Sequence, residues 1–307
     1  MKHITRLPET EQTHPTAPAL NRREFFTGVL ATAALTTMGR AAGPAPRWQI
    51  GCYTRPWAEH EPRVALDAIA EAGYKFAGLM TAKGGTIVLA TTPSEKVAAL
   101  AEDAKARGLK IASIWGGDFL APKSPADSIA RLQKLVDHCV LCGCPSLLLG
   151  GTGKAELVEP YYKAVKECCA YAASNGVVFA VKPHGGTNST GPECRKLIES
   201  VGHRSFRLWY DPGNIFYYSD GKRNPVDDAA TVDGLVAGMS VKDFLPPKEV
   251  NVTPGTGQVD FSKVLARLRR GGFTSGPLVV ECLARGDLAQ TNIEAKRARL
   301  FLEELVR

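Results

Sequence analysis

Charged side chains end, or nearly end, four apolar runs in the second half of the sequence. They are Lys182, Asp211, Lys242 and Glu281, and His184 follows just after the first. A carboxylate can remove a proton from the carbon next to a carbonyl, and a nearby cation stabilises the enediolate that forms. We therefore predict Glu281, Lys182 and His184 as catalytic residues, with Asp211 and Lys242 binding substrate.

Flat aromatic and basic side chains follow two of the earlier apolar runs. Trp57 and Trp115 offer faces on which a sugar ring can stack, and Arg55 suits an anionic group such as a uronate or a phosphate. We predict all three as substrate-binding residues.

Two further polar positions belong to the same set. Asn214 comes one short turn after the third charged run and is predicted to contact a substrate hydroxyl. Lys242 is followed at once by Asp243, so an internal ion pair between these neighbours is an alternative to a role in the site.

The apolar runs recur at the pitch of repeated strand–helix units. The predicted strands are Trp48–Tyr53, Lys75–Met80, Lys110–Ile114, Ser146–Leu149, Val177–Lys182, Phe206–Asp211, Gly238–Lys242 and Pro277–Cys282. Segments with helical periodicity separate them: Pro62–Ala72, Pro93–Arg107, Pro125–Cys142, Leu157–Ser174, Pro192–Val201, Asp260–Arg270 and Leu288–Val306. Thr92, Ser124 and Asp260 are predicted to cap their helices.

Eight such units predict an α/β fold, a single (β/α)8 TIM barrel. A doubly wound sheet would need a phosphate-binding loop, and the glycine-rich stretch 150–154 lacks either nucleotide fingerprint. In a barrel, the carboxyl ends of all strands meet at one mouth, which is where the charged residues above are expected to converge.

The positive charge does not indicate nucleic-acid binding. The formal net charge is +7, from 38 basic and 31 acidic residues, and residues 1–45 contribute five basic and three acidic ones, which leaves +5 on residues 46–307. The remaining basic residues are spread along the predicted helices without a run or a stripe. We expect no nucleic-acid partner.

Residues 1–45 have the pattern of a cleavable twin-arginine export signal and a short linker, and residues 46–307 form the barrel. Arg22-Arg23 precede the Ala- and Thr-rich apolar segment 27–38. This segment is well below the roughly 20 residues that span a bilayer, so no permanent membrane anchor is expected. The pattern predicts an exported, periplasmic protein that uses the twin-arginine machinery.

The eight cysteines do not predict a disulfide framework. Cys139, Cys142 and Cys144 lack a second ligand pair at zinc spacing, and Cys168 and Cys169 are adjacent within a helix. Small buried thiols are the expectation, and one disulfide is left open.

Four segments together resemble the xylose-isomerase-like TIM barrels. They are residues 206–214, 240–243, 254–261 and 278–281, which read FRLWYDPGN, SVKD, PGTGQVDF and LVVE. The group includes sugar-phosphate isomerases and epimerases, hydroxypyruvate isomerase, inosose dehydratase and tri-zinc endonucleases. The resemblance implies a divalent metal held by Glu, Asp, His and Glu on strands five to eight, a carbohydrate substrate, and a homodimer as an allowed assembly.

The sequence departs from that ligand pattern at two of the four positions. Asp211 and Glu281 match, but Lys182 replaces the first Glu and Ser240 replaces the His. A lysine ammonium and a divalent cation a few ångströms apart repel each other. The scarcity of histidines after residue 45 also argues against a tri-zinc nuclease.

Three accounts remain open. In the first, no metal is needed: Lys182 stabilises the enediolate, or forms a Schiff base, and Glu281 is the base. In the second, His184, Asp211 and Glu281 hold Mn²⁺ or Zn²⁺. In the third, the barrel only binds a carbohydrate.

We interpret the chain as an exported sugar isomerase or epimerase that acts on a sugar or keto-sugar through an enediol(ate). The alternatives are a lyase or hydratase of 3-keto sugars on the same barrel, which shares the proton abstraction, and a non-catalytic carbohydrate-binding barrel.

Overall fold

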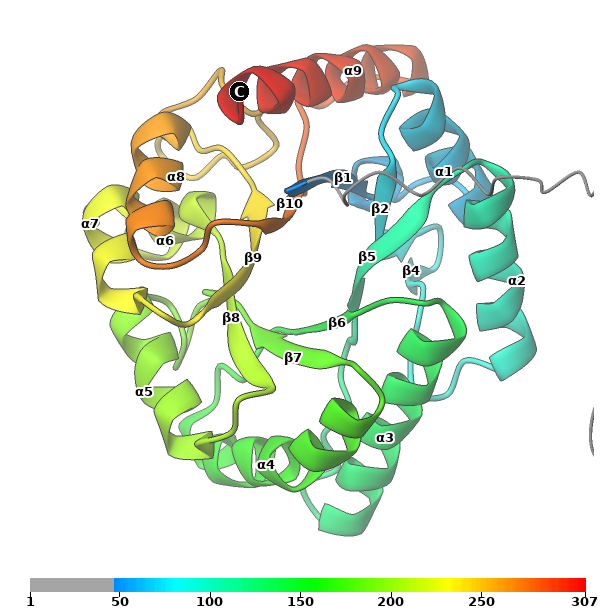
Figure 1. Cartoon of the computed structure of the whole chain (residues 1–307), viewed down its shortest axis with the longest axis vertical. Coiled ribbons are helices and arrows are strands. Elements are labelled where there is room, and N and C mark those ends of the chain that lie inside the picture. Colours follow the sequence, from blue (N-terminus) through cyan, green and yellow to red (C-terminus); the bar gives the residue numbers. More distant parts are fainter. Residues whose placement is uncertain (1–46) are drawn as a thin grey trace, which may run out of the picture. The chain divides into compact units, whose positions relative to one another are not determined.

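A closed barrel of eight parallel strands forms the centre of the molecule. The computed structural model describes residues 47–307, so the predicted export signal lies outside the described residues. Around the barrel the strands run in the order β1-β10-β9-β8-β7-β6-β5-β2 (Figure 1). Their bounds are β1 Trp48–Tyr53, β2 Phe76–Leu79, β5 Lys110–Trp115, β6 Ser146–Leu149, β7 Val178–Val181, β8 Phe206–Tyr210, β9 Val236–Val241 and β10 Gly276–Val280. The predicted (β/α)8 barrel is confirmed.

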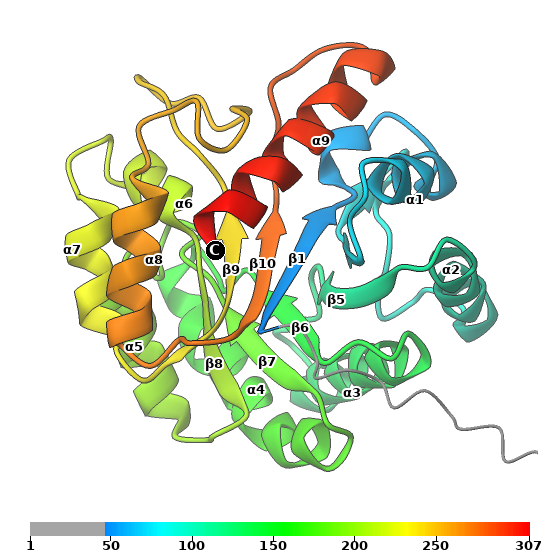
Figure 2. The ribbon, with the colours of Figure 1, turned by 45° about the horizontal axis from the view of Figure 1, so that its top comes forward.

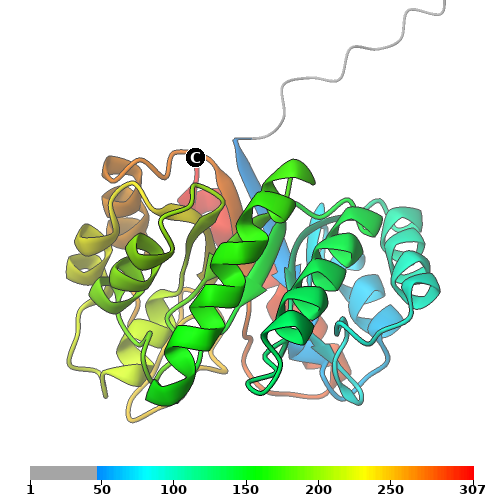
Figure 3. The same cartoon turned by 90° about the horizontal axis from the view of Figure 1, so that it is seen from below.

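Helices form the outer ring. They are α1 Pro62–Glu71, α2 Ser94–Ala106, α3 Pro125–Leu141, α4 Val158–Ser174, α5 Gly191–Val201, α6 Pro212–Tyr218, α7 Pro225–Ala229, α8 Phe261–Arg270 and α9 Leu288–Leu305. Figure 2 shows α9 passing over the neighbouring strands β1 and β10, and Figure 3 shows the green helix α4 crossing the strands from outside. The longer helices each bury one apolar stripe against the barrel.

Predicted and observed elements agree closely where periodicity is strong. All eight strands were predicted to within two residues at either end, and seven helices to within one. Ser124 and Asp260 cap α3 and α8 as expected, by accepting from the amides of Asp127 and Lys263. The cap predicted at Thr92 is wrong, because its hydroxyl accepts from the amide of Leu89 instead.

Two short helices and a hairpin were not predicted. The helices α6 and α7 lie between β8 and β9, and the hairpin joins β3 (Thr81–Ala82) to β4 (Gly85–Thr86) after β2. Helices of seven and five residues are too short to show a hydrophobic period, so only their caps and prolines signal them.

A small apolar cluster fills the barrel interior. Its buried members come from seven strands or strand ends: Tyr53, Met80, Ala112, Leu148, Ala180, Trp209 and Val279. The indole of Trp209 fits because Gly238 on the next strand has no side chain; a Cβ there would lie 2.3 Å from the ring. This packed layer forms the floor on which the charged residues stand.

The remaining sequence expectations concern thiols, histidines and membrane spans. All eight cysteines lie within residues 47–307 and are free; seven are buried, as expected, and Cys142 is partly buried. His138 is fully buried in α3, and the ring of His203 accepts from the amide of Ser205, so both belong to the scaffold. No helix in the described part of the chain is long and apolar enough to cross a membrane.

Candidate active site

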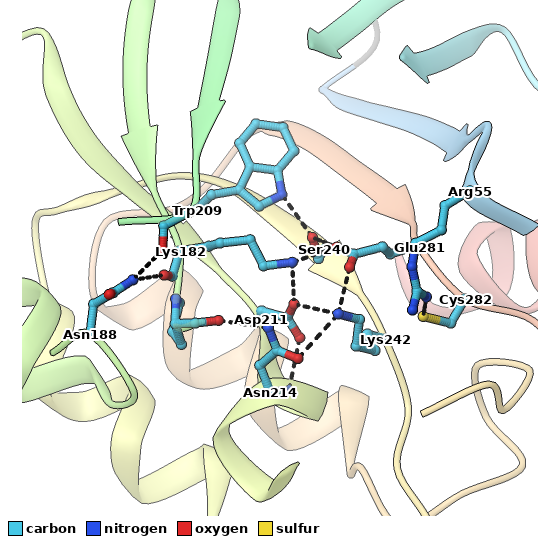
Figure 4. A network of polar contacts seen from close by, with 12 residues as sticks. Arg55, Lys182, Asn188, Trp209, Asp211, Asn214, Ser240, Lys242, Glu281 and Cys282 are labelled. Atoms are coloured by element: carbon cyan, nitrogen blue, oxygen red, sulfur yellow. Dashed lines mark hydrogen bonds and ion pairs between the residues drawn. The ribbon is translucent and has the colours of Figure 1, made fainter. Parts of the chain in front are cut away.

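The carboxyl ends of β7, β8, β9 and β10 bring four charged side chains into contact. The ammonium of Lys182 lies 2.7 Å from Asp211 Oδ2 and 2.6 Å from Glu281 Oε2 (Figure 4). All three side chains are at most 4 % exposed. Three residues that are 29 or more positions apart in the sequence thus form one buried ionic contact, as the barrel geometry predicted.

A second lysine completes the cluster. Lys242 Nζ lies 2.5 Å from Glu281 Oε1 and 3.2 Å from Asp211 Oδ2, so each carboxylate contacts two ammonium groups. We name Lys182, Asp211, Lys242 and Glu281 the two-lysine cluster. Buried charges of this kind persist only when opposite charges offset their lost hydration, which the alternating arrangement provides.

Glu281 is the most heavily contacted carboxylate. Its Oε2 accepts from Lys182 and, at 2.6 Å, from the hydroxyl of Ser240, whose oxygen accepts in turn from the indole of Trp209. Burial alone would raise the pKa of Glu281, but the ammonium groups of Lys182 and Lys242 outweigh it and hold that pKa well below its ordinary value. The same carboxylates raise the pKa of Lys242 against the opposing effect of burial.

Asn214 and a glycine hold Lys242 in place. The carboxamide of Asn214 accepts from Lys242 Nζ at 3.1 Å and donates to the carbonyl of Pro183. Its backbone amide donates to Asp211, which caps α6. A Cβ at Gly213 would lie 2.7 Å from the Lys242 carbonyl oxygen, so only glycine lets α6 approach this closely. Asn214 therefore contacts the cluster directly.

The suggested ion pair between Lys242 and Asp243 is not formed. The Asp243 carboxylate accepts from four backbone amides, those of Phe244, Gly255, Gly257 and Val259, at 2.8–3.0 Å. Neighbouring side chains of an extended chain point to opposite sides, so the lysine enters the mouth while the aspartate faces the loop behind it. The segment 254–259 is therefore a loop whose backbone is held in place by the Asp243 carboxylate.

Sequence reasoning missed two supporting residues. Ser240 was noted only as a replaced ligand, yet its hydroxyl connects Glu281 to Trp209. Asn188 donates to the carbonyls of Lys182 and Gly150 and so ties the end of β7 to the end of β6. Neither position has a spacing that marks it in a single sequence.

A cavity of about 290 Å³ opens above the cluster. Its floor is made by Lys182, Lys242 and Glu281, whereas Arg55 and His184 stand at its sides. Three cations and one carboxylate among these residues make the cavity electropositive, which favours an anion or a developing oxyanion.

The aromatic wall of the cavity includes one of the two predicted tryptophans. Trp115 lines it beside His184, with ring centroids 5.3 Å apart, and the ring of Tyr218, which also lines the cavity, lies 6.1 Å from the imidazole. His184 lines the cavity as an exposed residue, and desolvation by the surrounding protein, together with the positive charges of Lys182 and Lys242, lowers its pKa to about 4. The imidazole is therefore neutral at pH 7.

The second predicted tryptophan lies elsewhere. Trp57 is 1 % exposed and donates from its indole to Asn292 of α9, so its ring faces are buried in the core and not in the cavity. Arg55 does line the cavity, and its guanidinium also contacts the thiol of Cys282 (Figure 4).

The residues of this mouth do not fit a divalent metal. Between Asp211 and Glu281, where the resemblance places the ion, stand two ammonium groups within 3.2 Å of the carboxylates. In residues 47–307 no three His, Cys, Asp or Glu side chains are grouped to hold a metal ion, so His184 does not join the two carboxylates as a ligand.

Comparison with known proteins agrees with this architecture. A family model described as xylose isomerase-like TIM barrel matches residues 66–305. The inosose dehydratase of Glaesserella parasuis is 26% identical over 244 residues, which cover 68% of this chain and 81% of that protein. A probable L-ribulose-5-phosphate 3-epimerase of Mycoplasma pneumoniae is 27% identical over 115 residues, which are 36% of each chain.

Solved structures share the fold. A xylose isomerase domain protein from Planctomyces limnophilus superposes with a TM-score of 0.67 at 21% identity, covering 85% of this chain and 98% of that one. With the family match over most of the barrel, these findings identify a sugar epimerase/isomerase-like barrel. The chain belongs to the xylose isomerase-like TIM barrel family.

Proposed function

We propose that this protein is a sugar isomerase or epimerase that enolises a keto-sugar with lysine ammonium groups in place of a metal ion. The observation that carries the proposal is the two-lysine cluster, in which Lys182 and Lys242 both contact Glu281 at the floor of the cavity. In this proposal the two ammonium groups supply the positive charge that the ligand pattern implied by the resemblance assigns to a divalent cation.

The ammonium groups suit the stabilisation of an enediolate. When a proton leaves the carbon next to the carbonyl, the electron pair of that C–H bond moves to the carbonyl oxygen, which becomes negative. Cations that already lie at the cavity floor stabilise that negative oxygen electrostatically. Lys242 is suited to donate the hydrogen bond because Asn214 and two carboxylates hold its ammonium in place.

Glu281 is the proposed base. In the free protein two ammonium groups and the Ser240 hydroxyl keep its proton affinity low. A sugar oxygen that draws one ammonium away would remove one of these contacts and raise the pKa of the carboxylate. For isomerisation, Glu281 returns the proton to the neighbouring carbon on the same face, while the hydroxyl proton of that carbon passes to the first oxygen. For epimerisation, the original carbon is reprotonated from the opposite face, which requires a second proton donor there, such as solvent water.

His184, Asp211 and Trp115 have supporting roles in this proposal. The neutral imidazole of His184 can both donate to and accept from a sugar hydroxyl. Asp211 positions the two lysines, and the Trp115 face packs against the sugar ring. The relative named inosose dehydratase favours a second candidate, in which the same enediolate expels the hydroxyl of the next carbon, which leaves as water with the proton that Glu281 took up.

Deuterium exchange tests the proposal. Keto-sugars incubated with the protein in D2O should gain deuterium next to the carbonyl, and the signal should persist after exhaustive chelation with EDTA. Loss of exchange on chelation, with recovery on adding Mn²⁺, would refute the lysine mechanism. No exchange with any sugar that binds would leave the carbohydrate-binding barrel as the better account, and an unsaturated product would identify the dehydratase.

Residues 1–45 carry a separate proposal, that they direct export by the twin-arginine route. The support is the sequence alone, Arg22-Arg23 ahead of a short apolar segment. Replacing both arginines by lysine should retain the protein in the cytoplasm of the native host. Unchanged periplasmic recovery of that variant would refute the proposal.

A further inference from the structure

A second cavity adjoins the first at the mouth of the barrel. It has a volume of about 410 Å³ and lies over the segment that follows β10, residues 282–286, and the turn that follows β1. Arg55 and Thr81 line both cavities. On the loop after β9, Val250 faces the first cavity and Asn251 the second. The two cavities therefore share two walls, and neither is remote from the two-lysine cluster.

The walls of the second cavity carry polar side chains that are free to bind a ligand. Arg285 and Glu59 line it as exposed residues, and neither forms an ion pair with any residue of 47–307. The Asn251 carboxamide donates to Glu249, and no contact to its oxygen is seen among the described residues. Apolar patches from Pro56 and Leu283 lie between these groups.

This mixture suits a sugar unit better than an isolated anion. A sugar presents hydroxyls, which pair with guanidinium, carboxylate and carboxamide groups alike, and also C–H faces, which pack on apolar patches. A phosphate site would be expected to exclude a free carboxylate such as Glu59. The guanidinium of Arg55, the other cation here, is already engaged with the thiol of Cys282.

We propose that the second cavity is a subsite for a second sugar unit, so that the substrate is a glycoside of at least two units. The keto-sugar that reacts lies over Lys182, Lys242 and Glu281, and its glycosidic neighbour extends past Arg55 to Asn251 and Arg285. Which of the two units reacts rests on the proposed function. The existence of the subsite does not, because it concerns binding alone.

Equilibrium binding to the full chain tests the subsite. The probes are D-fructose and three glucosyl-fructoses with a free keto end, namely turanose, maltulose and isomaltulose, measured by titration calorimetry. At least one disaccharide should bind ten times more tightly than fructose. Equal or weaker binding of all three, or no binding of any probe, would overturn the proposal.

A matched pair of variants locates the effect. Ala284→Phe fills the second cavity, and Ala121→Phe places the same side chain in a separate cavity of about 230 Å³ beside α3 and α4. Both alanines are half-buried loop residues. Their backbone amides donate to the hydroxyls of Thr253 and Ser128, and these bonds do not involve the side chain that is changed. Circular dichroism checks that both variants fold.

Ala284→Phe should weaken disaccharide binding tenfold or more, to the level of fructose, and leave fructose binding within twofold. Ala121→Phe should change neither. An equal loss for fructose and disaccharide in Ala284→Phe, or no loss for either, would overturn the subsite. So would fructose 6-phosphate that binds as tightly as the best disaccharide and loses that affinity in Ala284→Phe, because the cavity would then be an anion site. Failure of deuterium exchange leaves these binding results unaffected and bears only on the proposed function.

Discussion

Two buried carboxylates that follow the neighbouring strands β9 and β10 have different kinds of hydrogen-bond partner. Glu281 is surrounded by two lysine ammonium groups and a serine hydroxyl, whereas Asp243 accepts from four backbone amides. A backbone amide cannot leave without unfolding the loop, but a lysine side chain can turn toward a ligand. The difference separates a carboxylate that is available for chemistry from one that holds structure.

The first prediction concerns the carboxylate that faces the cavity. Glu281→Gln removes the base and keeps the volume, so we expect deuterium exchange to fall by about 10³-fold, within the usual range for a lost general base. Because the two buried ammonium groups then have only Asp211 as a counter-charge, the free energy of unfolding should also fall, by about 3 to 5 kcal/mol in urea denaturation, so exchange is compared per folded molecule. Exchange within tenfold of the wild type would remove Glu281 from the role of base.

The second prediction concerns the carboxylate that holds the loop. In Asp243→Asn the new amide group must point its own donors at some of the four backbone amides, which leaves buried donors unsatisfied. We expect a loss of about 2 to 3 kcal/mol in the free energy of unfolding. Exchange per folded molecule should fall less than in Glu281→Gln. A variant as stable as the wild type but as inactive as Glu281→Gln would reverse the comparison.

The difference between these two carboxylates also marks the limit of what the sequence predicts. The strands and long helices were predictable because hydrophobic period and cap residues are local signals. The convergence of Lys182, Asp211, Lys242 and Glu281 followed from the barrel, which places all strand ends at one mouth.

Other parts of the site depend on direction and packing, which a single sequence does not carry. Lys242 and Asp243 are adjacent and of opposite charge, so pairing was a reasonable alternative, and only the backbone path sends them apart. Trp57 was expected in the mouth, but the 3-10 turn Arg55–Trp57 directs its ring into the core toward α9. The helix α6, whose Gly213 and Asn214 position Lys242, was too short to predict.

The third prediction tests whether the lysine cluster stands in for a metal. Lys182→Glu combined with Ser240→His restores the ligand types that the family pattern has on strands five and seven, beside Asp211 and Glu281. We expect this double variant to bind Mn²⁺ at least tenfold more tightly than the wild type, since it converts a repelling ammonium into a ligand. Titration calorimetry measures this. Tight stoichiometric Mn²⁺ binding by the wild type would contradict the proposal that the two lysines replace a metal ion.

The fourth and smallest predicted effect concerns a buried ionisable group that is compensated neither by opposite charges, as Glu281 is, nor by backbone amides, as Asp243 is. His138 is fully buried in α3 and forms no ion pair within residues 47–307. Burial, with Lys134 nearby, lowers its pKa below the ordinary value of 6.5. Well above that pH the ring is neutral in both the folded and unfolded states, so it adds no pH dependence to the free energy of unfolding.

As the pH falls below about 6.5, the unfolded chain takes up a proton on this ring more readily than the folded one, so the folded state loses stability. His138→Leu removes that difference. Urea denaturation at pH 7.5 and 5.5 should therefore show a smaller decrease for His138→Leu than for the wild type, with the two proteins within about 1.5 kcal/mol of each other at pH 7.5. His203→Gln is the control, since that half-exposed ring only accepts from a neighbouring amide, and it should retain the full decrease. If the free energy of unfolding decreased equally in all three proteins, the burial of His138 would make no measurable contribution to the pH dependence of stability. The comparison of buried ionisable groups would then apply only to Glu281 and Asp243.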